Sequence, residues 1–147
     1  MATHDDLPST SEWVKRWTRS IPKGGMVLDL ACGRGRHAIY LAKLGYYVYA
    51  VEKDPQLVKG LNGAVGIEVV EFDLESEPWP FCPESFDGVI VTNYLHRPLF
   101  PNLIITIKAN GILIYETFAH GNEKYGKPSN PNFLLQSGEL LEVVRGK

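Results

Sequence analysis

The sequence predicts an α/β fold in which a doubly wound, mostly parallel sheet is flanked by helices. Short apolar runs of strand length alternate with helix-length segments along the chain, and this alternation is typical of crossover units that build a parallel sheet covered on both faces. Polar residues stand at or just past the ends of four of these runs, where a doubly wound sheet binds its ligands. Both observations predict a ligand-binding fold.

Length and composition fit a single domain over residues 1–147, with 44% hydrophobic and 22% charged residues. The net charge of −2 and the lack of a Lys and Arg cluster argue against nucleic acid as a partner. No signal-peptide pattern opens the chain, and no apolar run is long enough to cross a bilayer. We therefore expect a cytoplasmic protein with no membrane partner.

The first third of the chain is predicted to form a helix, a strand, a second helix and a second strand. Ser9 and Glu12 make a capping-box pattern before the first helix. The apolar residues that follow recur at helical spacing and should pack this helix on the core: Trp13, Val14, Trp17 and Ile21. A strand over 26–30, a helix over 36–44 and a strand ending near residue 52 come next.

The remaining elements are predicted to be three strands and the connections between them. Residues 56–66 allow only a short helix because three glycines interrupt them. Strands follow over 67–75, 86–93 and 111–118. The segment 102–109 has the β-branched composition of a strand, but a crossover must connect two parallel strands. We therefore predict a helix there.

Four polar side chains follow four different predicted strands: Asp29, Glu52, Asp73 and Asn93. Taken one at a time, each is equally well explained as an ordinary strand-end residue. Together they would meet at the carboxyl edge of one sheet, which indicates a binding cleft. The turn over 33–35, with a glycine at each end, would let a ligand approach the backbone closely.

Two cofactor classes fit such a cleft. The stretch "GRGRHA" (33–38) matches the dinucleotide pattern GxGxxA, with Glu52 placed to hold a ribose. A pyrophosphate, however, prefers a helix N-terminus free of negative charge, and Asp29 lies just upstream of the turn. S-adenosylmethionine carries a sulfonium and an ammonium and no phosphate. Asp29 therefore favours S-adenosylmethionine as the cofactor.

The stretch "VLDLACGRG" (27–35) resembles the first motif of class I S-adenosylmethionine-dependent methyltransferases. Further stretches, including "FDGVIVTNYLHRPLF" and "LIYETFAHGNEKYGKPSNPNFLLQSGELL", resemble a small bacterial subfamily grouped with the tellurite-resistance-type methyltransferases. The resemblance runs from about Ser11 to Val144. It implies a Rossmann-like fold and methyl transfer from S-adenosylmethionine.

The resemblance also implies roles for individual residues. Asp29 would bind the amino group of the cofactor, Glu52 both ribose hydroxyls, and Asp73 the adenine amine. The implied cofactor-binding set is Asp29, Ala31, Cys32, Gly33, Arg34, Gly35, His37, Glu52, Lys53, Asp73, Leu74 and Asn93.

The sequence departs from the class I pattern at its C-terminal end, where the hairpin of strands six and seven is lacking. Strand 111–118 would then be an edge with unpaired backbone groups. A fragment, a natural truncation and a dimer that covers the edge all explain this. We favour a homodimer through the strand-five edge.

Methyl transfer is an in-line displacement that depends mainly on alignment of donor and acceptor. We expect a small-molecule acceptor, with Tyr94, His96 and Glu116 as candidate catalytic groups, although a structural role explains His96 equally well. The histidines lack a metal-ligand spacing, so we predict no metal site. The long loop over 118–137 is expected to cover the acceptor side of the cleft, although a simple connection whose prolines guide the chain explains it equally well.

Two alternative functions remain from the sequence. A truncated, catalytically weak S-adenosylmethionine-binding module would explain the short C-terminal end. A nucleotide-dependent oxidoreductase would explain the GxGxxA pattern, but the position of Asp29 argues against it.

Overall fold

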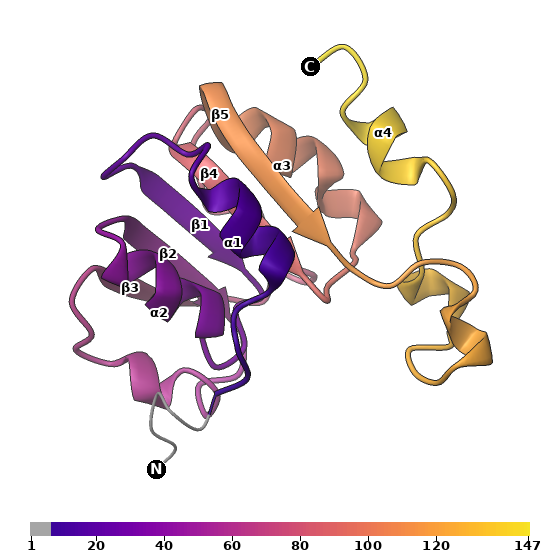
Figure 1. The fold of residues 1–147 in the computed structure, drawn as a ribbon, viewed down its shortest axis with the longest axis horizontal. Coiled ribbons are helices and arrows are strands. Elements are labelled where there is room, and N and C mark those ends of the chain that lie inside the picture. Colours follow the sequence, from indigo (N-terminus) through magenta and orange to yellow (C-terminus); the bar gives the residue numbers. More distant parts are fainter. Residues whose placement is uncertain (1–6) are drawn as a thin grey trace.

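In the computed structural model, which describes residues 7–147, five parallel strands form one sheet in the order β3-β2-β1-β4-β5 (Figure 1). The strands are β1 (Met26–Leu30), β2 (Tyr47–Glu52), β3 (Ile67–Glu71), β4 (Phe86–Thr92) and β5 (Ile107–Glu116). The chain adds β2 and β3 on one side of β1, and then β4 and β5 on the other. This reversal confirms the predicted doubly wound, Rossmann-like sheet and places its switch point between β1 and β4.

In the part of the chain that the structure describes, four short α-helices and four 3-10 turns connect or flank the strands. The helices are α1 (Glu12–Thr18), α2 (Arg36–Lys43), α3 (Phe100–Thr106) and α4 (Glu139–Val143). The 3-10 turns are η2 (Lys59–Leu61), η3 (Arg97–Leu99), η4 (Asn122–Lys124) and η5 (Pro131–Phe133). Within residues 7–147, no helix has both the length and the apolar character needed to span a membrane.

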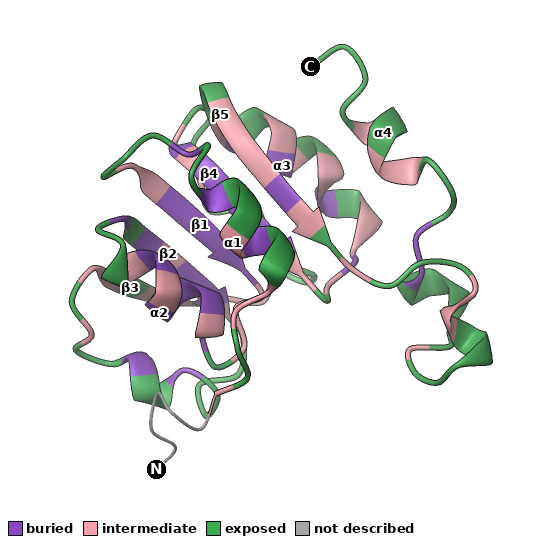
Figure 2. Cartoon of the chain, in the orientation of Figure 1, coloured by how far each residue is buried: buried purple, intermediate pink, exposed green. Residues whose placement is uncertain are grey.

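Two hydrophobic clusters cover the two faces of the sheet. Val27 belongs to the cluster under α1 and α2, whereas its neighbour Leu28 belongs to the cluster under α3. This alternation follows from the two-residue period of a strand. Figure 2 shows that burial is greatest in the three central strands β2, β1 and β4. The core therefore fixes those strands whose carboxyl ends surround the switch point.

The start of α1 differs from the sequence prediction. Ser11, not Ser9, is the N-cap: its Oγ accepts the backbone N–H groups of Trp13 and Val14 at 3.2 and 3.4 Å. Val14 is fully buried, but Trp13 and Trp17 are 44% and 38% exposed. The prediction that both tryptophans pack in the core is therefore wrong. Of the seven residues of this helix, only Val14 and Thr18 are buried.

The segment 102–109 is both helix and strand, so the prediction of a helix throughout is wrong. α3 ends at Thr106, and β5 begins at once with Ile107, which pairs with Phe86 of β4. The register shifts beyond this pair. The end of the segment, which is rich in β-branched residues, thus pairs as a strand with the available edge of β4. Within 56–66, where three glycines allow only a short helix, the structure has the 3-10 turn η2.

Arg97 attaches the C-terminal segment to the rest of the structure. Its Nε lies 2.6 Å from Glu139 Oε2, and a second guanidinium nitrogen donates to Glu139 Oε1 at 3.0 Å. The guanidinium also donates to the carbonyls of Asn132 and Leu134 at 3.1 and 2.8 Å. Since a planar guanidinium can satisfy a carboxylate and two carbonyls at once, one side chain fixes the path of residues 132–139.

We expect Arg97→Gln to loosen this segment without unfolding the sheet. Loss of the two-point ion pair at a partly exposed site should lower the free energy of local opening by about 1–2 kcal/mol. Hydrogen exchange over residues 131–144 should therefore become roughly tenfold faster. Hydrogen–deuterium exchange read by mass spectrometry would measure this. Arg145→Gln, which removes an exposed ion pair with Glu142, is the matched control. Equal protection in all three proteins would contradict the assignment.

Candidate functional site

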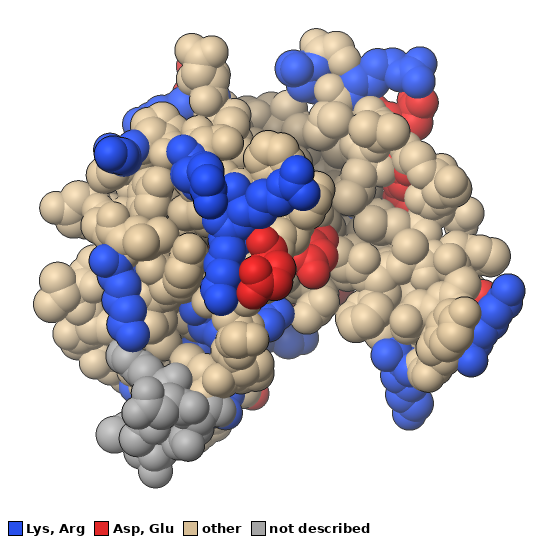
Figure 3. Space-filling model, in the orientation of Figure 1, with Lys and Arg blue, Asp and Glu red and all other residues tan. Residues whose placement is uncertain are grey.

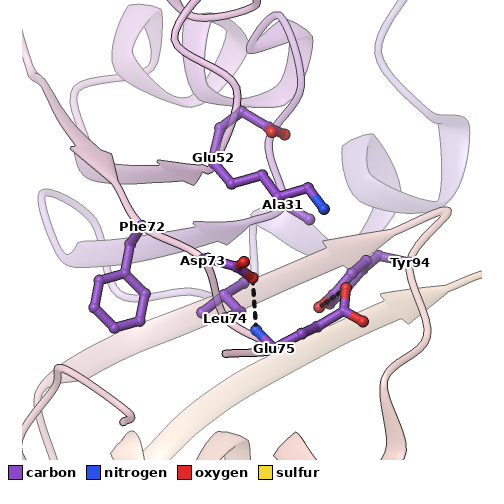
Figure 4. A pocket seen from close by; sticks show the side chains of 8 residues that line it. Ala31, Glu52, Phe72, Asp73, Leu74, Glu75 and Tyr94 are labelled. Atoms are coloured by element: carbon purple, nitrogen blue, oxygen red, sulfur yellow. Dashed lines mark hydrogen bonds between the residues drawn. The ribbon is translucent and has the colours of Figure 1, made fainter. Parts of the chain in front are cut away.

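A pocket lies at the carboxyl edge of the sheet, beside the switch point (Figure 4). Its cavity volume is about 200 Å³, which is smaller than the roughly 300–1,000 Å³ typical of whole small-molecule sites. The wall consists of residues at or just after four strand ends: Ala31, Glu52, Lys53, Phe72, Asp73, Leu74, Glu75 and Tyr94. The predicted polar residues Glu52 and Asp73 therefore meet, whereas Asp29 and Asn93 stand outside this wall.

Glu52 joins the end of β2 to the glycine turn. Its Oε1 accepts the backbone N–H of Gly33 at 3.1 Å, and its Oε2 accepts that of Asp54 at 3.0 Å. Gly33 has φ +58°, and a Cβ added there would meet no atom within 4 Å. The turn therefore leaves open space in front of its backbone. At Gly35 (φ +84°) a Cβ would lie 2.6 Å from a methyl of Leu61, so this glycine is required for packing.

Asp29 is 1% exposed, and its burial raises the carboxyl pKa from 3.8 to about 7. The backbone N–H of Ala38, in the first turn of α2, donates to this carboxylate, and the charge of Arg36 also lowers its pKa. Oδ2 has no partner among the described residues. Asp29 is thus placed under the start of a helix, where the partial positive charge stabilises an acid. One of its oxygens is left for a further donor.

Asp73 presents a charged acceptor in the pocket. Its Oδ1 accepts the backbone N–H of Glu75 at 3.0 Å, drawn as a dashed line in Figure 4. This hydrogen bond, together with the Ser76 side chain, holds the pKa of Asp73 below its usual value. Asp73 is therefore ionised at neutral pH, and the buried Leu74 beside it completes this part of the wall.

Glu75 contacts two polar side chains at the opposite side of the pocket. Its Oε2 accepts the hydroxyl of Tyr94 at 3.3 Å, and its Oε1 lies 3.4 Å from Nδ1 of His96. The hydroxyl of Tyr115 donates to the backbone carbonyl of Tyr94 at 2.7 Å. Burial, and then the charge of Glu75, raise the pKa of Tyr94 above its usual value. Tyr94 is therefore a neutral hydrogen-bond donor.

Sequence reasoning missed Glu75 and Phe72 as lining residues. Both flank Asp73 in the loop after β3, so their position beside a predicted strand-end acid was the available signal. Nothing in the sequence shows that the Glu75 side chain crosses to Tyr94, because that contact joins loops from two different strands.

Two of the predicted site residues belong to a separate network outside the pocket wall. His37 is buried; its Nε2 accepts the backbone N–H of Ser11 at 3.2 Å, and its Nδ1 lies 3.3 Å from Thr92 Oγ1. Burial lowers the pKa of His37 to about 4, so the ring is neutral. The Ser11 hydroxyl donates to Glu116 Oε2. This network fastens the start of α1 to the ends of β4 and β5.

The other predicted residues lie around the turns at the same edge. Cys32 is partly buried, and burial followed by the charge of Asp29 raises its thiol pKa above the usual value. Arg34 is exposed. Asn93 is exposed with φ +54°, and its backbone N–H donates to the Glu116 carbonyl at 2.8 Å. These residues follow β1 and β4, the two strands on either side of the switch point, but they do not line the cavity.

The loop over 118–137 does not line this pocket either. It contains η4 and η5, and a parallel bridge between Ala119 and Leu135 closes its base. It is therefore an ordered excursion beyond the end of β5 (Figure 1). Among residues 7–147, no group of three or more His, Cys, Asp or Glu side chains is arranged to hold a metal ion.

A family model described as a methyltransferase domain matches residues 27–108. These residues run from β1 into the start of β5 and include the whole pocket wall. The chain therefore belongs to this methyltransferase domain family.

Individual relatives and solved structures agree with this assignment. The Bacillus subtilis protein YqeM, which carries a methyltransferase name, is 25% identical over 130 residues, covering 78% of this chain and 52% of YqeM. The chain thus spans about half the length of that relative. A TehB-like S-adenosylmethionine-dependent methyltransferase from Corynebacterium glutamicum superposes with a TM-score of 0.67 at 24% identity, covering 89% of this chain and 68% of that one.

A second solved structure, a methyltransferase from Aquifex aeolicus that depends on S-adenosylmethionine, also has a TM-score of 0.67. It is 20% identical and covers 90% of this chain and 76% of that one. At these identities the likeness shows the fold. The resemblance to class I methyltransferases that the sequence predicts is therefore confirmed at the level of fold and family.

The buried Asp29 predicts a pH-dependent stability difference. Because the folded pKa is raised, the native protein retains a proton between about pH 4 and 7 that the unfolded chain releases, so stability falls as pH rises through this window. Asp29→Asn cannot ionise and should escape this loss. We therefore compare the free energy of unfolding of the variant with that of the natural protein. On going from pH 4 to pH 8, this difference should change by roughly a few kcal/mol in favour of the variant.

Urea unfolding at both pH values would measure this difference. Other titrating groups, His37 among them, act equally on both proteins and cancel in the comparison. A difference between the two proteins that stays constant with pH would contradict the buried ionisation.

Proposed function

We propose that this chain is an S-adenosylmethionine-dependent methyltransferase that acts on a small-molecule acceptor. The observation that carries the proposal is the meeting of Glu52 and Asp73 with the open turn at Gly33. Acceptors for ribose hydroxyls and an adenine amine thus stand beside a backbone that a ligand can approach closely. Membership of the methyltransferase domain family supports the same function.

The residues present fit the adenosine part of this cofactor. Asp73 is ionised and faces the cavity, so it can accept hydrogen bonds from the exocyclic amine of adenine. Glu52 uses each oxygen once, for Gly33 and Asp54. A carboxylate has about four acceptor sites, so two remain for the ribose hydroxyls. The side of the cavity lined by Glu52 and Asp73 would hold this half of the cofactor.

The residues around the glycine turn fit the methionine part. The unpartnered Oδ2 of Asp29 is the acceptor that a cofactor ammonium would satisfy, directly or through water. The open space in front of Gly33 would receive the amino-acid end of the methionine part. We place Lys53 and Leu74 beside the adenosine part, next to Glu52 and Asp73. The remaining predicted residues are placed around the methionine part: Ala31, Cys32, Arg34, Gly35, His37 and Asn93.

The cofactor, when bound, supplies a methyl group activated by the adjacent sulfonium. The protein then needs to hold the acceptor in line with that methyl group and to exclude water, effects that are worth several kcal/mol of barrier. Tyr94 lines the pocket and is held from both sides, so it positions the acceptor. His96 would accept a proton from an acceptor that arrives protonated. Glu116 would have a positioning role, because its carboxylate accepts the Ser11 hydroxyl and so holds the start of α1.

Two finer assignments also rest on this proposal. We infer that the chain acts as one domain over residues 1–147 and that it belongs with the tellurite-resistance-type methyltransferases. The likeness to the TehB-like structure over 89% of this chain supports the second. A binding module without catalysis would bind the cofactor equally well. Release of S-adenosylhomocysteine with an added acceptor separates the two.

Binding of S-adenosylhomocysteine but not of NAD is the expected result of a thermal-shift titration. At 100 times its dissociation constant a ligand stabilises by about 2.7 kcal/mol, or roughly 5–10 °C for a domain of this size. Glu52→Gln should weaken binding about tenfold because an amide nitrogen cannot accept a ribose hydroxyl.

Glu71→Gln is the matched control, since Glu71 pairs in register with Glu52 but does not line the pocket. Stabilisation by NAD, or by neither compound, would overturn the proposed cofactor. An equal loss of binding in both variants would remove the role of Glu52.

We further propose that two copies of the chain pair through the outer edge of β5. Among the described residues β5 pairs only with β4. An apolar groove of about 290 Å³ runs beside it between α1, α3 and α4, and Figure 3 shows the molecule hollowed where the C-terminal segment stands away from the sheet. Unpaired backbone groups and apolar side chains together favour pairing with a second strand.

Light scattering coupled to size-exclusion chromatography should therefore give about twice the chain mass of 16.4 kDa at high micromolar concentration. A single monomeric mass across the whole concentration range would remove the dimer.

A further inference from the structure

We propose that Glu75 and the ring of Tyr94 bind the methyl acceptor, and that this acceptor is an organic amine that binds as its ammonium and gives one proton to His96 before its nitrogen, with a free lone pair, takes the methyl group. The inference rests on the proposed function, because it assumes that Glu52 and Asp73 are occupied by the cofactor. It names the chemical class of the acceptor, which the fold and family leave open.

The charge balance of the pocket wall points to a cation. Three carboxylates line it, from Glu52, Asp73 and Glu75, against the single ammonium of Lys53. Two of the three have roles toward adenosine, and Lys53 adjoins Glu52 in the chain. Glu75 is then the carboxylate without an assigned ligand. An anionic acceptor would meet repulsion from all three.

The surroundings of Glu75 leave it able to bind a further donor. Its side chain is 45% exposed, and each oxygen has one neighbour, the Tyr94 hydroxyl and His96 Nδ1. About two acceptor sites therefore remain on the carboxylate. The two neighbours fix the orientation of the group, so an incoming ammonium meets a carboxylate that is already held in place. His96 has a positioning role in this binding.

Tyr94 supplies the second half of an ammonium site. Its hydroxyl is held by Glu75 and its backbone carbonyl by the Tyr115 hydroxyl at 2.7 Å, so the ring has a fixed place in the pocket wall. Figure 4 shows the Glu75 and Tyr94 side chains reaching toward one another there. A carboxylate beside an aromatic ring attracts an organic ammonium through both charge and the ring quadrupole. Neither a neutral alcohol nor a carboxylate gains from both.

Three probes with the same aromatic body test this inference: 2-phenylethylamine, 2-phenylethanol and 3-phenylpropionate. Each is titrated into the ¹⁵N-labelled full chain with saturating S-adenosylhomocysteine, and the amide signals of residues 72–76 and 93–97 are followed by NMR. We expect the amine to shift these signals and the other two to leave them unchanged. Glu75→Gln should weaken amine binding about tenfold, the loss expected for one charge-assisted hydrogen bond.

Glu77→Gln is the matched control, since it removes the same charge two residues away on a side chain that does not line the pocket. Tyr94→Leu, which removes the ring, should also weaken amine binding, whereas Tyr94→Phe should keep it within about twofold. Equal binding of all three probes, or unchanged amine binding in Glu75→Gln, would overturn the inference.

Thermal shifts with S-adenosylhomocysteine alone separate the two proposals. Stabilisation of the natural chain and of both Glu variants, without amine binding, overturns the amine site and leaves the proposed function standing. If S-adenosylhomocysteine fails to stabilise any of them, the proposed function is wrong. The amine titration is then read without it, and a loss of binding in Glu75→Gln but not in Glu77→Gln supports an ammonium site independent of methyl transfer.

Discussion

The parallel pairing of β1 with β2 on one side and with β4 on the other is the constraint on which the rest of the structure depends. Leu28 faces Tyr49 and Val89 across these two ladders, and the central strands are the most buried part of the sheet. Because all strands are parallel, their carboxyl ends meet at one edge, and the glycine turn, Glu52 and the loops after β3 and β4 lie around the same opening.

The buried carboxylate of Asp29 destabilises the fold and would attract a cationic ligand. Asp29 sits under the first turn of α2 with one oxygen unpartnered, and burial raises its pKa to about 7. A buried, incompletely bonded carboxylate is costly, and a cationic ligand would lower that cost. Glu52 and Asp73 are instead held ready by backbone N–H groups. The site is thus preorganised at Glu52 and Asp73 and incomplete at Asp29.

The C-terminal third is fixed by contacts of a different kind. Leu134 and Leu135 are buried, and Arg97 joins Glu139 to the turn that follows His96. The loop over 118–137 is therefore anchored at its base, and its tip lies away from the pocket wall. The connection after β4 is thus held at Tyr94 by the Tyr115 hydroxyl and at Arg97 by the C-terminal segment.

The sequence by itself determined that the sheet is doubly wound, that a site lies at its carboxyl edge, and that Glu52 and Asp73 line it. These features follow from the alternation of strand-length and helix-length segments, from the polar residues at strand ends and from the glycine spacing. Tertiary structure decided the rest. It divided 102–109 between α3 and β5, since a free edge of β4 outweighed the crossover. It turned His37 inward to Ser11 and Thr92, and it brought Glu75 to Tyr94. These contacts join segments far apart in the chain, and no local pattern of residues encodes them.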